Sequence, residues 1–146
     1  MTGKSTPYVF DMHNLKRYRF PTHINDLVVD RAQSQHSEVF FVVIEPGQGT
    51  LLHKHDENEQ IFYVTEGTGI LTIGEKEEQW RVKAGDVVRI PVSTLHAIST
   101  DGTIALRYLC IDCFGEKPRT EPTWDDHVKT MCTTNGWDYS NVVSGK

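Results

Sequence analysis

Short apolar segments separated by turn residues run through most of this chain. The first is residues 37–45 (SEVFFVVIE), which Pro46-Gly47 ends. Seven more follow at 50–55, 60–65, 69–73, 78–82, 86–90, 95–99 and 104–112. No helical periodicity separates them, and most gaps contain Gly, Pro, Asn, Asp or Ser. This pattern predicts eight β-strands in an all-β sandwich or closed barrel.

The two ends of the chain follow other patterns. Residues 1–36 form a weakly patterned extension with one candidate strand at 26–30 (DLVVD), and the predicted barrel occupies 37–114. In the tail, 115–146, Thr123 can cap a helix from about Trp124 to Thr133 that Asn135-Gly136 ends. Trp124, His127, Val128 and Met131 fall near helical spacing, so we expect this short helix to pack on the barrel.

Composition narrows the class of protein. The chain has 146 residues, which fits one domain, and a net charge of −5 with no basic cluster, so we expect no nucleic-acid partner. It contains no apolar run of 18 residues and no apolar segment after its first residues, which predicts neither a membrane span nor a secretion signal. Three cysteines suit a reducing compartment. We therefore expect a cytoplasmic protein.

Three histidines carry the strongest chemical signal. His53 and His55 are two residues apart in a predicted strand, where alternation directs both side chains to one face. Two imidazoles on one face are half of a metal site. Gln60 and His96 supply an amide oxygen and a third imidazole that could complete it.

The spacing of these residues resembles the two motifs of the cupin superfamily. Gly47, His53-x-His55, Gln60 and Gly67 follow the first motif. Gly85, Pro91-x-Ser93-x-x-His96 and Thr100 follow the second, after a 17-residue insert typical of small single-domain cupins. The resemblance implies a double-stranded β-helix (jelly-roll) barrel. It also implies a divalent metal held by His53, His55, Gln60 and His96.

One departure from the motif affects the chemistry. The family carries Glu where this chain has Gln60, while Ser93 and Thr100 replace Gly and Asn at positions that we take as structural. Moving the frame by one residue would make Glu59 the ligand, but it would also turn the strand at 61–65 over. We therefore assign Gln60 and keep Glu59 as a candidate beside the metal.

The ligand set implies a class of chemistry. A divalent ion with three imidazoles and an amide keeps its full charge, which favours Lewis-acid chemistry over oxygen chemistry. Small cupins that act on unsaturated uronates have a similar ligand pattern. We expect an isomerase or lyase acting on a small sugar acid, or on a hydroxy or keto acid. An iron-dependent dioxygenase and a non-catalytic small-ligand-binding cupin are the alternatives.

Several features stay open at this level. Imidazole and amide ligands suit manganese, iron, nickel, zinc and copper alike. Besides Glu59, either Arg107 or Tyr108 could face the interior as a catalytic group, but alternation forbids both. Like many members of the family, the chain is expected to form a homodimer.

The remaining histidines and the cysteines lack such a context. We expect surface or capping roles for His13, His23, His36 and His127. Cys110 and Cys113 have the spacing of a redox or zinc motif. In a strand, however, they face opposite sides, and no second cysteine pair completes a zinc site.

Overall fold

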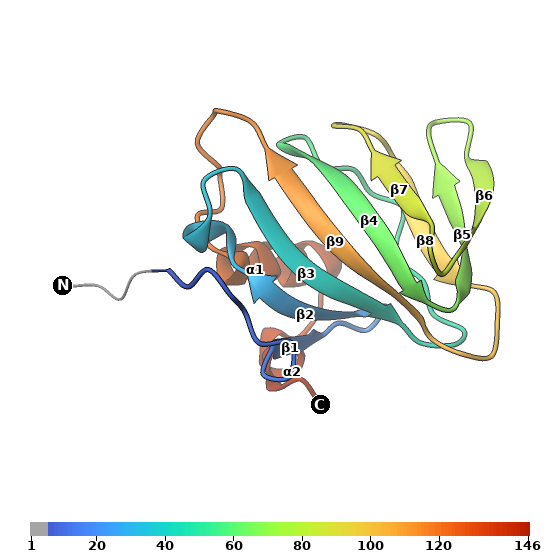
Figure 1. The fold of residues 1–146 in the computed structure, drawn as a ribbon, viewed down its shortest axis with the longest axis horizontal. Helices are drawn as coiled ribbons and strands as arrows, with labels where there is room; N and C mark the ends of the chain where they lie inside the picture. Colours follow the sequence, from blue (N-terminus) through green and yellow to red (C-terminus); the bar gives the residue numbers. More distant parts are fainter. Residues whose placement is uncertain (1–5) are drawn as a thin grey trace.

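The computed structural model describes residues 6–146 and contains two antiparallel sheets that face each other (Figure 1). The larger sheet has the order β1 (Lys16–Arg19), β2 (Ile24–Val29), β3 (Ser37–Ile44), β9 (Leu106–Phe114), β4 (Asn58–Glu66) and β7 (Val87–Ile90). The smaller has the order β6 (Glu78–Lys83), β5 (Thr68–Ile73) and β8 (His96–Thr100). The all-β prediction is confirmed.

Strict alternation in the long strands builds the interior. Burial alternates residue by residue along β3 and β9, as a sheet with one covered face requires. The inward side chains of the larger sheet meet those of the smaller one in a single core. Its members include Val42, Ile44, Phe62, Leu71 and Ile98.

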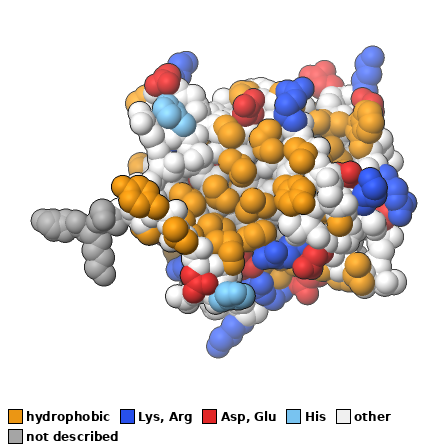
Figure 2. Space-filling view, viewed as in Figure 1, with side chains coloured by type: hydrophobic (Ala, Val, Ile, Leu, Met, Phe, Trp, Pro, Cys, Tyr) orange, Lys and Arg blue, Asp and Glu red, His pale blue; other side chains and the backbone are white. Residues whose placement is uncertain are grey.

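The outer face of the larger sheet is also apolar. The strand register places Val39, Ile111 and Ile61 in one row across β3, β9 and β4, and Phe41, Leu109 and Tyr63 in the next. Figure 2 shows these strands' hydrophobic side chains gathered on one face of the molecule. A contiguous patch of this kind is typical of an interaction surface. The homodimer stays a prediction.

The C-terminal tail folds back against the inner face of the larger sheet. Helix α1 (Trp124–Asn135) begins at Thr123, whose side chain caps it, and ends at Gly136 with φ = 70°. It lies behind β2 and β3 in Figure 1, and the Trp124 ring packs 4.6 Å from that of Phe40. The predicted helix is confirmed and runs two residues further. A second helix, α2 (Tyr139–Ser144), was not predicted.

Two sequence expectations change. The segment 50–55 is not a regular strand, because only the isolated bridges Gly49↔Ser99 and His53↔His96 join it to β8. The N-terminal extension contributes two strands, β1 and β2, instead of one. Among the described residues, no helix has both the length and the apolar composition needed to cross a bilayer.

A buried ion pair fixes the connection between β2 and β3. Arg31, in the short 3-10 helix Arg31–Gln33, donates from Nε and Nη2 to the two carboxylate oxygens of Glu38 at 2.8 and 3.0 Å. Its Nη1 reaches the backbone carbonyl of Glu121 at 3.1 Å. Both charged side chains are almost completely buried. One guanidinium therefore joins the N-terminal extension, β3 and the segment that leads into α1.

Trp124 should contribute strongly to stability, because its side chain is 1% exposed. We expect Trp124→Ala to lower the free energy of unfolding by about 3–5 kcal/mol, the usual cost of truncating a buried large aromatic side chain. Trp80→Ala is the control, since Trp80 is 56% exposed, and it should change stability by about 0.5 kcal/mol or less. Urea denaturation measures both, and equal effects would contradict the docking of α1.

Removing Glu38 should leave the Arg31 guanidinium buried without its counter-charge. We expect Glu38→Leu to destabilise the fold by about 3–5 kcal/mol. Glu45→Leu removes the carboxylate from the partly exposed Arg19–Glu45 pair and should cost about 1 kcal/mol or less. The same denaturation measurement compares them. A Glu38 variant as stable as the Glu45 variant would show that the buried pair does not hold these segments.

Candidate metal centre

Three histidines converge although they come from two separate segments. His53 and His55 lie in the connection between β3 and β4, and His96 begins β8. The backbones of His53 and His96 pair through two hydrogen bonds of 3.0 and 2.8 Å. One nitrogen from each of the three rings lies within 4.8 Å of the others. Three imidazoles gathered in this way are a typical set of ligands for one divalent ion.

The turn before β8 holds His55 in position. The backbone N–H of Ser93 donates to the carbonyl of His55 at 2.7 Å, and the Ser93 hydroxyl donates to Asp56 at 2.7 Å. Ser93 has φ = 57°, the left-handed conformation that favours glycine. Ser93 therefore keeps the backbone shape of the motif glycine that it replaces. Its hydroxyl adds a contact that glycine lacks.

The three imidazoles are neutral and their ring nitrogens are oriented. Burial lowers the pKa of His55 to about 2 and that of His96 to about 4, and it also lowers the pKa of His53. Nδ1 of His53 lies 2.5 Å from the carbonyl of Leu51, and Nδ1 of His96 lies 2.9 Å from that of Thr94. A carbonyl can only accept, so each Nδ1 carries the hydrogen and each Nε2 keeps its lone pair for a metal.

Gln60 lines the same cavity as the histidines, with one end of its amide unpaired. Its side chain is 6% exposed and lines the same cavity. Nε2 donates to Asp112 Oδ1 at 2.8 Å, whereas Oε1 is buried without a hydrogen-bond partner in the described part of the chain. An unpaired buried oxygen is costly unless a ligand satisfies it. Three neutral imidazoles and this oxygen fit a divalent metal.

Strand alternation decides which of the other candidate catalytic residues face the cavity and which face outward. Glu59 is exposed on the outer face of β4, so it does not lie beside the metal position. Arg107 also faces outward, with its guanidinium 3.8 Å from the centre of the Phe41 ring. Tyr108 faces inward, is buried and lines the cavity. Burial raises the pKa of its phenol well above the usual range, so the hydroxyl stays protonated.

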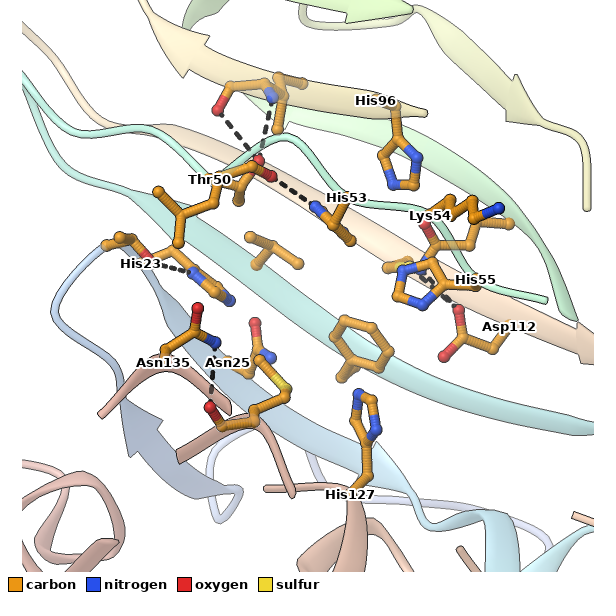
Figure 3. A pocket seen from close by; sticks show the side chains of 18 of the residues that line it. His23, Asn25, Thr50, His53, Lys54, His55, His96, Asp112, His127 and Asn135 are labelled. Carbon is orange, nitrogen blue, oxygen red and sulfur yellow. Dashed lines mark hydrogen bonds between the residues drawn. The ribbon is translucent and has the colours of Figure 1, made fainter. Parts of the chain in front are cut away.

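The histidines open into a cavity of about 380 Å³ between the larger sheet and α1. Figure 3 shows His53, His55 and His96 on one side, with His23, Asn25 and His127 opposite them. The expected surface or capping roles of His23 and His127 are therefore wrong, because the fold brings both rings to the cavity wall. His13 and His36 are exposed, as expected.

A chain of buried polar groups links the two sides of the cavity. Asp112, which accepts from Gln60, also hydrogen-bonds Glu38. Burial, with Glu38 beside it, raises the pKa of Asp112 well above its usual range, so this carboxyl keeps a proton. Beyond Glu38, Arg31 lies 3.8 Å from a carboxylate oxygen of Glu121, which in turn bonds His127 at 2.9 Å.

The cysteine pair forms neither a disulfide nor a zinc site. Cys110 is buried and lines the cavity, while Cys113 lies on the opposite face of β9, as alternation predicts. Burial raises the pKa of the Cys110 thiol well above its usual range. An un-ionised thiol is a poor nucleophile and a poor ligand.

About half of the chain is similar in sequence to a curated protein. An uncharacterized protein of Methanocaldococcus jannaschii is 41% identical over 68 residues, which cover 47% of this chain and 53% of the relative. The chain thus spans about half the length of this curated relative.

Solved structures share the architecture. A predicted oxalate decarboxylase from Thermotoga maritima superposes with a TM-score of 0.67 at 20% sequence identity. The superposition covers 73% of this chain and 99% of the decarboxylase chain. A putative sugar phosphate isomerase from Acidithiobacillus ferrooxidans superposes with a TM-score of 0.54 at 27% sequence identity. The superposition covers 68% of this chain and 67% of the isomerase chain.

The family assignment follows from the sequence between β3 and β9. Residues 40–112 match the Cupin_2 family model, described as a cupin domain. This range contains both histidine motifs and Gln60, and it amounts to half of the chain. The two facing antiparallel sheets are those of double-stranded β-helix structures. The chain therefore belongs to the cupin family.

Proposed function

We propose that this cupin is a metalloenzyme that acts on a small hydroxy or keto acid, such as a sugar acid, by isomerisation or elimination. His53, His55 and His96 would hold a divalent ion through Nε2, and Gln60 through Oε1. The observation that carries the proposal is the buried, unpaired Oε1 of Gln60 in the same cavity as three neutral imidazoles. A structural role alone would leave this oxygen without a partner.

The charge of the ligand set favours an anionic substrate. Gln60 is neutral, and burial keeps His55 and His96 neutral at pH 7. A divalent ion bound there keeps its full charge, so it polarises a carbonyl or hydroxyl oxygen more strongly than an ion with a carboxylate ligand does. Asp112 adds no negative charge because it stays protonated. The cavity is therefore suited to a carboxylate.

The chain's own groups then orient the substrate. The protonated hydroxyl of Tyr108 can donate a hydrogen bond to a substrate oxygen inside the cavity. Phe62 and Phe40 line the apolar wall around it, which excludes water and strengthens each polar contact. The putative sugar phosphate isomerase among the similar structures supports the choice of isomerase chemistry on a hydroxylated substrate.

Metal binding should depend on the three clustered histidines and not on a histidine outside the cavity. We expect about one equivalent of divalent metal in the purified protein and in His36→Ala, whose histidine is exposed away from the cavity. His55→Ala should lose the metal, because two imidazoles and an amide bind divalent ions far more weakly. Elemental analysis of the three proteins measures this. Equal metal content in wild type and His55→Ala would contradict the assigned site.

The reaction class should show in its oxygen dependence. We expect protein loaded with zinc, nickel or manganese to convert a panel of uronates and hydroxy acids without oxygen, with products identified by NMR. The Lewis-acid account requires no electron transfer. Turnover only with iron and oxygen would establish a dioxygenase instead. Thermal stabilisation by a panel compound with no turnover under any metal would establish a binding protein.

A further inference from the structure

The cavity wall opposite the three histidines carries polar groups that metal binding does not use. Helix α1 contributes His127, and β2 contributes Asn25. Figure 3 shows both side chains on the side of the cavity away from His96. Neither residue belongs to the two histidine motifs. Their chemistry therefore bears on what the cavity holds besides a metal.

The neutral His127 ring has a hydrogen-bond acceptor for a ligand in the cavity that it lines. Its Nδ1 lies 2.9 Å from Glu121 Oε1. The bond from His127, helped by the nearby Arg31 charge, lowers the pKa of Glu121 to about 2, so the carboxylate is ionised and can only accept. Nδ1 therefore carries the hydrogen, and in the neutral ring Nε2 has a free lone pair. The carboxylate also fixes the orientation of the ring, as in other histidine–carboxylate pairs.

Asn25 supplies a second unsatisfied acceptor. Its side chain is 3% exposed and lines the cavity. Its Oδ1 finds no hydrogen-bond partner in residues 6–146. A buried amide oxygen in this state needs a donor, and the apolar residues Phe40 and Met131, which line the same cavity, have none.

We propose that His127 and Asn25 form a subsite for the hydroxyl groups of a small polyhydroxy acid, whose carboxylate lies at the histidines. The proposal rests on the proposed function, which places the acidic end of the substrate at the metal. Hydroxyl groups donate hydrogen bonds, so they satisfy both acceptors. An ionised dicarboxylate such as oxalate has no donor and would leave both unpaired. The subsite thus selects sugar-acid-like substrates over dicarboxylates.

Binding of two matched acids to the zinc-loaded protein tests the subsite. D-gluconate carries five hydroxyl groups, whereas hexanoate has the same carbon chain and none. We expect isothermal titration calorimetry to give gluconate at least about tenfold tighter binding than hexanoate, and also tighter binding than oxalate. A tenfold ratio of the two dissociation constants is what we expect when hydroxyl groups satisfy the buried acceptors. Equal affinities for gluconate and hexanoate, or tighter oxalate binding, would overturn the subsite.

Variants then assign the preference to these two residues. Asn25→Leu and His127→Phe should each weaken gluconate binding about tenfold and leave hexanoate binding unchanged. His127→Phe keeps an aromatic ring but removes both ring nitrogens, and it keeps the measurement possible if Asn25→Leu does not fold, because the His127 side chain is 21% exposed. His36→Phe is the matched control and should change neither affinity. An unchanged gluconate preference in His127→Phe would overturn the role of that ring.

Zinc content separates failure of the subsite from failure of the metal site. Both cavity variants should retain zinc as the wild type does, since neither residue is a proposed ligand. Bound zinc without a gluconate preference overturns the subsite alone. A wild type that binds neither zinc nor manganese, iron, nickel or copper overturns the proposed function, and the subsite that rests on it falls with it.

Discussion

The hydrogen bond between Gln60 and Asp112 decides what the centre of this barrel can bind. Because Gln60 Nε2 donates to Asp112 at 2.8 Å, Oε1 is the end of the amide left for a ligand. Asp112 is itself fixed by Glu38, and Glu38 by two bonds from Arg31. Turning the amide over would place a donor against the histidines, where a cation cannot bind. The ligand set thus depends on a buried network outside it.

The same network also explains why α1 belongs to the site. Arg31 bonds the carbonyl of Glu121 just before α1 begins, and Glu121 orients His127, the fourth residue of that helix. Trp124 packs against the inner face of the sheet and keeps the helix there. The barrel supplies the three clustered histidines, Gln60 and one wall of the cavity, whereas the tail supplies part of the other wall. We infer that specificity lies in this added wall, because the histidine motifs belong to the barrel.

Sequence reasoning identified the barrel and its histidines but not the opposite wall. The motif spacing and period-two alternation placed Gln60 inward, as the structure has it, whereas Glu59, kept as a candidate beside the metal, points outward. The choice between Arg107 and Tyr108 needed the register of β9, which only the whole sheet fixes. The helical spacing put His127 on the packed face of the predicted helix, but it gave no signal for a role in the cavity. Its partner Glu121 lies in an irregular segment, and its place in the cavity depends on how α1 docks. Tertiary contacts, which leave no local pattern, decide such positions.

A crystal structure of the metal-loaded protein, with anomalous data collected at the absorption edge of the metal, would show whether Gln60 binds the ion together with the histidines. We expect one anomalous peak at about 2.0–2.3 Å from Nε2 of His53, His55 and His96 and from Oε1 of Gln60. A peak near the three histidines but far from Oε1 of Gln60, or a peak at the opposite wall of the cavity, would contradict this ligand set. The Gln60–Asp112 bond would then have a purely structural role.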